Sequence, residues 1–156
     1  MTATAIAHAP ATMPADPLLA NDVLAHLDAQ IDSAARLLEI VMAQSAAIRE
    51  RDVDGVLTQV GALQAELERR TRIEDDRARL LARAGATLRL PPEHVTLTRI
   101  TTLMGAPEAE RARARSEELQ RLLRELEAQH AANQALMRQE LAFLDHVLHA
   151  VQPAPQ

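Results

Sequence analysis

The chain lacks cysteine, lysine, tryptophan and tyrosine, and its only aromatic residue is Phe143. Without cysteine it can form no disulfide, thiolate or cysteine-based metal site, which fits a reducing compartment. Its hydrophobic content of 47% is mostly alanine and leucine, with few of the β-branched and aromatic residues that fill a sandwich or a barrel. The composition therefore favours an all-α fold in which helix packs on helix.

Every cationic side chain is an arginine, and the formal net charge is −5. Arginine and acidic residues alternate along the sequence, most densely over residues 66–77, which is typical of a solvated helix face with ion pairs one turn apart. Nucleic-acid binding is the weaker alternative, because the chain has neither a net basic charge nor a set of stacking aromatic residues. We expect no nucleic-acid partner.

The 156 residues fit one domain, which we place at residues 17–151. Residues 1–16 contain no basic residue and no sustained apolar core, so we expect a disordered tail and no signal peptide. Residues 152–156 form a short proline-rich tail. Since no segment approaches the roughly 18 to 20 apolar residues of a membrane helix, we expect no membrane span and a cytoplasmic protein.

The most informative pattern is a seam, by which we mean apolar residues spaced alternately three and four positions apart. That spacing keeps one narrow face of a helix against a partner helix over many turns. The first seam comprises Leu24, Leu27, Ile31, Ala34, Leu38, Val41, Ser45 and Ile48. It predicts a long helix that packs in a coiled-coil manner.

Capping residues predict where this helix begins and ends. Asp16 followed by Pro17 is a typical helix start, and the helix should run to about Glu50. Asp52 offers a new cap, so we expect a tight turn there, although a continuous helix is possible because the segment contains no glycine or proline. The second helix should end with Gly85 as its C-terminal cap. Its seam comprises Val53, Val56, Val60, Leu63 and Leu67.

Between residues 87 and 105 lies a connector with apolar residues of its own. A short helix over Leu97–Met104 would fold them onto one end of a helical bundle; a strand over residues 95–102 is the weaker alternative. The third long helix should begin near Pro107 and run to Val151, about 68 Å against about 50 Å for each of the others. Part of it must therefore be exposed, bent or available to another molecule.

The end of this third helix carries two apolar stripes. With Met137 placed at zero and about 100° per residue, the first stripe lies within about 40° of it, and the second lies roughly 80–120° away. The first stripe comprises Met137, Leu141, Leu144, Leu148 and Val151, and the second comprises Leu136, Phe143 and Val147. One stripe is enough for a two-helix seam, so the second indicates either a further helix of the same bundle or a bound partner.

Upstream of the stripes, His130 and Asn133 occupy seam positions where leucine would pack more tightly. Polar residues at such positions lower stability and set the register of helices. A seam weakened in this way could suit a helix that repacks around a partner.

Two histidine spacings could suggest a metal site. Glu127-x-x-His130 occurs once, whereas a carboxylate di-metal site needs that motif twice, and His146-x-x-His149 supplies two ligands without a third. The chain also contains no phosphate-binding loop and no nucleophile elbow. We therefore expect no metal, no cofactor and no catalytic residue, and hence no enzyme.

Three segments together resemble the FlgN family of flagellar export chaperones. Residues 47–85 are similar to that family's first pair of helices joined by an acidic turn, and VTLTRITTLMG is similar to its short connecting helix. SEELQRLLRELEAQHAANQALMRQELAFLDHVLHAV is similar to its last helix. The resemblance covers about residues 18–151, in the family's order.

The resemblance implies a cytoplasmic chaperone that keeps hook-associated proteins, which join the flagellar hook to the filament, soluble and unassembled. It also implies that the chaperone binds the C-terminal helical segments of these clients and delivers the clients to the membrane-embedded export gate. The partner-binding residues carried over are Asn133, Leu136, Met137, Leu141, Phe143, Leu144, Val147 and Leu148. A chaperone of the filament-cap protein and a coiled-coil stalk component of the export ATPase are the alternatives.

Taken together, the sequence predicts an all-α antiparallel three-helix bundle or coiled coil, with a long C-terminal helix and a short connecting helix. A groove on this bundle would cover the amphipathic helix of a client. An apolar face left open in the absence of a client also predicts a weak homodimer.

Overall fold

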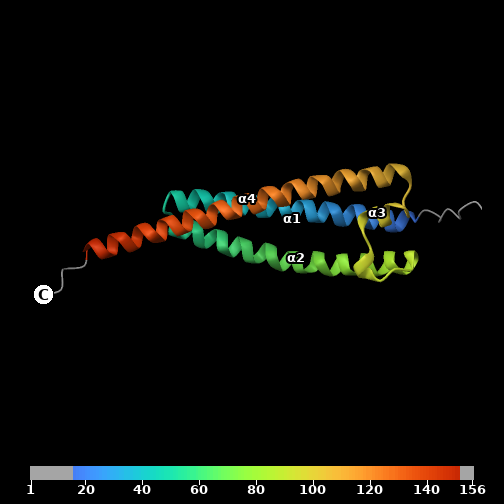
Figure 1. Cartoon of the computed structure of the whole chain (residues 1–156), viewed down its shortest axis with the longest axis horizontal. Helices are drawn as coiled ribbons and strands as arrows, with labels where there is room; N and C mark the ends of the chain where they lie inside the picture. Colours follow the sequence, from blue (N-terminus) through green and yellow to red (C-terminus); the bar gives the residue numbers. More distant parts are fainter. Residues whose placement is uncertain (1–15, 152–156) are drawn as a thin grey trace, which may run out of the picture.

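The computed structural model describes residues 16–151, and over that range it contains helices and no strand (Figure 1). The four α-helices are α1 (Pro17–Arg49), α2 (Val53–Leu88), α3 (Leu97–Thr101) and α4 (Ala106–Val151), and a 3-10 turn spans Pro92–His94. The predicted all-α fold, with its long last helix and short connecting helix, is confirmed. The two predicted tails lie outside the described residues, except for Asp16.

Helix α1 is the central element of the bundle. It packs against α2 along one side and against α4 along another, whereas α2 and α4 share no comparable interface (Figure 1). Every member of the predicted seam of α1 is buried or partly buried, and residues of α1 outside that seam, such as Val23, Leu37 and Ala47, are buried as well. The bundle is thus arranged around α1.

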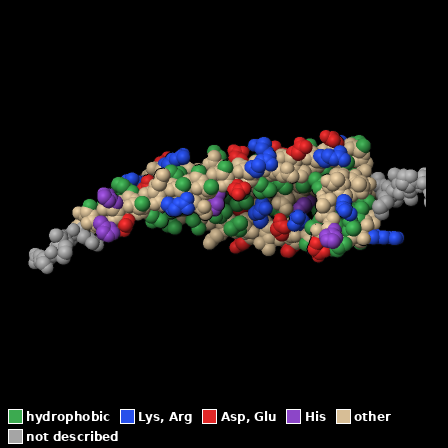
Figure 2. Space-filling view, viewed as in Figure 1, with side chains coloured by type: hydrophobic (Ala, Val, Ile, Leu, Met, Phe, Trp, Pro, Cys, Tyr) green, Lys and Arg blue, Asp and Glu red, His purple; other side chains and the backbone are tan. Residues whose placement is uncertain are grey.

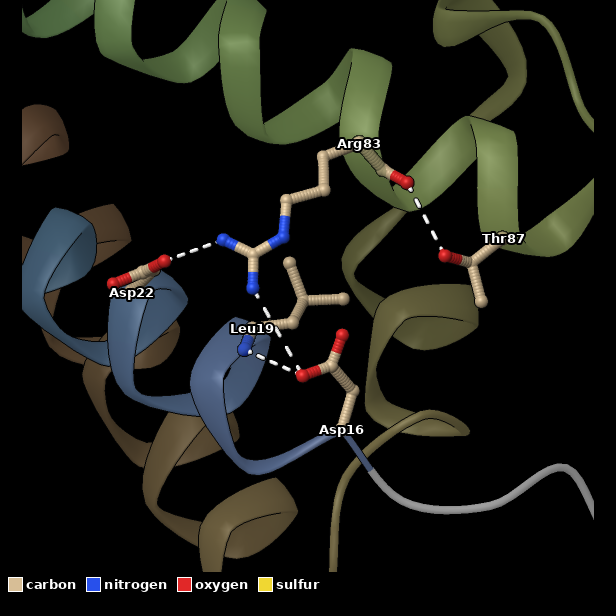
Figure 3. Close-up of polar contacts among 5 residues, drawn as sticks. All are labelled: Asp16, Leu19, Asp22, Arg83 and Thr87. Atoms are coloured by element: carbon tan, nitrogen blue, oxygen red, sulfur yellow. Dashed lines mark hydrogen bonds and ion pairs between the residues drawn. The ribbon is translucent and has the colours of Figure 1, made fainter.

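The start of α1 follows the predicted capping. The Asp16 carboxylate accepts a hydrogen bond from the Leu19 backbone N–H at 3.0 Å, and Pro17 occupies the first turn, where its missing N–H needs no partner (Figure 3). Arg83 of α2 reaches across to Asp22 and to the same Asp16 carboxylate. The cap of α1 is therefore also a contact point between α1 and α2.

A tight turn separates α1 from α2, as predicted. The N–H of Arg51 donates to the carbonyl of Ile48 at 3.1 Å, and the N–H of Asp52 donates to that of Ala47 at 2.9 Å. Arg51 has a φ of 56°, so the turn is a Schellman motif with arginine at the left-handed position. The Asp52 carboxylate then accepts the Gly55 N–H at 2.9 Å and caps α2.

The predicted end of α2 at Gly85 is wrong. The helix continues to Leu88, and Arg89, at a φ of 56°, forms the left-handed cap. Gly85 is buried, and a Cβ added there would lie 2.6 Å from the backbone oxygen of Leu90. Glycine is therefore needed because the following loop folds back onto this turn of the helix.

The connector packs its apolar residues onto one end of the bundle, as expected, although α3 ends at Thr101 and not at the predicted Met104. Helix α4 begins one residue before the predicted Pro107. Leu103 is fully buried. The core at this end comprises Leu19, Ala20, Val23, Leu24, Ala84, Val95, Ile100, Leu103, Met104, Ala109 and Ala112.

The α1–α2 interface is more polar than the seam of α2 predicted. Val53, Val60 and Leu67 of that seam are exposed, whereas Glu66 is buried and lies 3.3 Å from Arg36 of α1. Further polar pairs across this interface are Arg70 with Ser33 and Gln30 with Glu74, in addition to Arg83 with Asp22 near the start of α1. The apolar stripe of α2 is thus turned partly away from α1.

Candidate partner-binding groove

Helix α4 projects beyond the end of α1, so its last turns are exposed, which is one of the outcomes that its length predicted (Figure 1). It has 46 residues against 33 in α1. Asn133 is its last buried residue, and every residue from Leu141 to Val151 is exposed. We call residues 141–151 the α4 overhang; at about 1.5 Å per residue it is about 16 Å long.

Seven of the eight predicted partner-binding residues lie at the surface or near it. Leu136 is partly buried, while Leu141 is 60% exposed and Val147 39%. Met137, Phe143, Leu144 and Leu148 are exposed as well. From Leu141 onward, no other helix within residues 16–151 buries either of the two stripes, so both are open over the overhang.

The side chain of the eighth predicted residue, Asn133, is buried between α4, to which it belongs, and α1. Its Nδ2 donates a hydrogen bond to the carbonyl oxygen of Val41 at 2.8 Å, and its Oδ1 is buried with no hydrogen-bond partner within the described residues. His130, one turn earlier, is exposed, and its Nε2 lies 3.2 Å from Gln134 Nε2. Asn133 therefore joins α4 to α1 about two helical turns before the overhang begins.

The face of α4 that packs on α1 continues into the overhang. With Met137 at zero, Asn133, Leu144 and Val151 fall within about 40° of it on the same side. The buried side of α4 therefore stays apolar after α1 has ended. A helix placed there would lie where α1 would run if it were longer.

A groove opens between this face and the beginning of α2. It has a volume of about 340 Å³, and Figure 2 shows hydrophobic side chains at the surface on this part of the molecule. Its lining residues are Ala47, Ile48, Arg51, Asp52, Val53, Val56, Met137, Glu140 and Leu144. The wall formed by α1 and α2 is not among the predicted partner-binding residues. The signal for it in the sequence is the apolar seam directly after the Asp52 cap.

Arg51 connects the turn to α4 across this groove. Its Nε lies 3.2 Å from Glu140 Oε2, and its Cζ lies 4.8 Å from the centroid of the Phe143 ring. The first contact is an ion pair and the second a cation–π interaction. Polar and aromatic groups thus meet at the edge of an otherwise apolar groove.

The histidines near this end form no metal site in the described part of the chain, where no group of three or more histidine and acidic side chains comes together. His149 lies 3.5 Å from Asp145 on the preceding turn, and both side chains are exposed. No helix within residues 16–151 has the length and apolar character needed to cross a bilayer.

A helical bundle whose longest helix keeps an open apolar face beside an apolar groove belongs to the class of helical proteins that bind other proteins. Comparison with known protein families identifies the family within this class: the family described as FlgN protein matches residues 13–156. The chain therefore belongs to the FlgN family, whose members are flagellar export chaperones. No curated protein and no solved structure matches the chain.

Proposed function

We propose that this chaperone acts in the cytoplasm and binds hook-associated proteins. It keeps the C-terminal helical segments of these clients soluble and unassembled, and it delivers them to the export gate. The observation that supports this proposal is the open apolar face of α4, which continues past α1 and borders a groove. A client helix in that position would cover apolar side chains that α1 is too short to reach.

Both stripes of the overhang contribute to the proposed docking face. The first stripe, with Met137 and Leu144, forms one wall of the groove. The second stripe, with Phe143 and Val147, extends the apolar surface beside it. Export requires that the client be released, and a dissociation constant in the micromolar to nanomolar range, about −8 to −12 kcal/mol, is compatible with that.

The distribution of apolar surface favours a chaperone over a stalk of the export ATPase. A stalk needs an even seam along its whole length, whereas the large exposed residues of α4 are concentrated between Met137 and Val151. A chaperone for the filament-cap protein would use the same face, so the choice of client separates these two proposals. In the absence of a client, the same face would support a weak homodimer.

Calorimetric titration with C-terminal segments of the hook-associated proteins tests the proposal. The test variant is Val147→Asp, which places a charge on the second stripe. The control is Leu123→Asp on the same helix, because Leu123 is 38% exposed and Val147 39%, and Leu123 precedes Asn133 and belongs neither to the two stripes nor to the groove.

We expect one-to-one binding that Val147→Asp weakens about tenfold or more, equivalent to 1.4 kcal/mol, and that Leu123→Asp leaves nearly unchanged. An affinity that Val147→Asp leaves unchanged would be consistent with the proposed function and would reject the proposed docking face. Binding to the filament-cap protein alone would favour the alternative client, and failure to bind either would reject the chaperone proposal for this chain.

A further inference from the structure

Arg51 occupies a backbone position at which glycine is favoured. Its φ of 56° places it in the left-handed region, at the residue after the α1 cap. A residue with a Cβ is strained there, so glycine or asparagine is the usual choice. Arginine at this position costs backbone stability, and only the contacts of its side chain can offset that cost.

The side chain of Arg51 makes both of its described contacts with α4. The ion pair with Glu140 and the approach to the Phe143 ring lie on consecutive turns of that helix, just after Met137. Glu140 lies between the two apolar stripes, and Phe143 belongs to the second. Arg51 therefore contacts α4 at the point where it leaves α1 and where both stripes begin to open.

Arg89 provides an internal comparison. It is the same residue type, with the same φ of 56°, at the end of α2. Within residues 16–151 its side chain makes no ion pair or hydrogen bond, and it is exposed. The left-handed backbone alone therefore does not produce the contacts of Arg51; they depend on its place beside α4.

We propose that Arg51 is a positioning residue, which holds the beginning of the α4 overhang against the α1–α2 turn and thereby sets the width of the groove. The contact with Glu140 spans the groove from the turn to α4, since both residues are among those that line it. The contact with Phe143 fixes the ring at the edge of the second stripe. Within residues 16–151, no other hydrogen bond or ion pair joins α4 after Asn133 to α1 or to the turn, so without these contacts apolar packing alone holds it there.

The first experiment measures amide hydrogen exchange in the free protein for Arg51→Gly, Arg51→Lys and Arg89→Gly. Arg51→Gly removes the contacts and relieves the backbone, so the chain as a whole should unfold at the same temperature or a higher one. The amides of residues 137–147 should nevertheless exchange about threefold to tenfold faster. Arg89→Gly should relieve the same backbone strain and leave those amides unchanged.

Arg51→Lys retains the positive charge near Glu140 and should restore part of the protection. A purely structural role for the turn predicts the opposite pattern, because glycine would then tighten both the turn and α4. Unchanged exchange at residues 137–147 in Arg51→Gly, or equal effects of Arg51→Gly and Arg89→Gly, would overturn the proposal.

The second experiment rests on the proposed function and repeats the client titration with the same variants. Arg51→Gly should weaken client binding about threefold to tenfold, and Arg89→Gly should not change it. In a Phe143→Leu background, Arg51→Gly should have a smaller effect, because the ring that it contacts is gone. Unchanged or tighter binding by Arg51→Gly would overturn the claim that Arg51 sets the groove.

The two experiments separate failure of this inference from failure of the proposed function. If the unmodified chaperone binds no hook-associated segment, the proposed function fails, while the exchange measurement still decides whether Arg51 positions α4. If the client binds and Arg51→Gly changes neither measurement, only the inference about Arg51 fails.

Discussion

At the scale of single residues, Asn133 marks the boundary between the packed and the open parts of α4. Its amide group donates to the backbone of α1, yet its buried Oδ1 lacks a partner among the described residues. A polar group buried in this way costs free energy that a leucine would not. The expected softening of the seam thus has a structural basis at Asn133, whereas His130 is exposed.

His26 is the residue whose titration should affect the fold. It lies partly buried between α1 and α2, with its Nε2 3.4 Å from Gln30 Nε2. Burial lowers the pKa of His26 below its ordinary value of 6.5, although Glu74 and Asp76 act in the opposite direction. The folded protein therefore favours the neutral imidazole.

The sign of the resulting pH dependence follows from linkage. When the pH falls below about 6.5, the unfolded chain protonates His26 before the folded chain does, so the free energy of unfolding decreases until the folded pKa is passed. We expect the melting temperature to fall between pH 7.5 and pH 5.5, and to fall less in His26→Gln. Parallel pH profiles for the two proteins would show that His26 does not contribute.

At the scale of the helical elements, two glycines of α2 should respond to alanine in opposite directions. A Cβ at Gly85 would meet the Leu90 backbone oxygen at 2.6 Å, whereas one at Gly61 would meet nothing within 4 Å. Gly85→Ala should therefore destabilise the fold by about 1 to 3 kcal/mol through overpacking. Gly61→Ala should stabilise it by about 0.5 to 1 kcal/mol, because alanine is the better helix former.

Chemical denaturation of the two variants in parallel checks this expectation. Stabilisation by both alanines would mean that the loop after α2 moves away from Gly85 at little cost. Destabilisation by both would mean that Gly61 has a packing role that its open surroundings do not reveal.

These elements show what local sequence can and cannot predict. The caps Asp16 and Asp52 act on their own first turns, so the starts of α1 and α2 could be read from the sequence. The role of Gly85 depends on where Leu90 returns, which is a tertiary contact, and the predicted end of α2 was therefore wrong. The regular spacing of the apolar residues in α2 was visible in the sequence, but spacing alone does not say which helix covers them. In the structure, Glu66 is buried facing Arg36 and part of the apolar seam is exposed.

At the scale of the whole molecule, helix lengths predicted the overhang, because α4 is longer than the helix that it packs on. Seven of the eight proposed docking residues could be placed at that end from periodicity alone. The opposite wall of the groove, with Ile48 and Val53, could not be placed in this way, because it depends on how the turn brings α1 and α2 beside α4. The exposed stripes within one helix were predictable, and the groove that joins three helices was not.

The overhang should be separable from the fold, because every buried residue of the described chain precedes Glu140. A chain that ends at Glu140 should therefore retain the core around Leu103 and unfold at nearly the same temperature, with helical circular dichroism reduced by the missing turns. It should bind the client segment at least about a hundredfold more weakly, because most of both apolar stripes is gone.

A chain that ends at Val151 is the matched control, since it loses only residues 152–156, and it should bind normally. Full affinity in the shorter chain would place the docking surface elsewhere, and loss of affinity in both chains would assign a role to the residues after Val151.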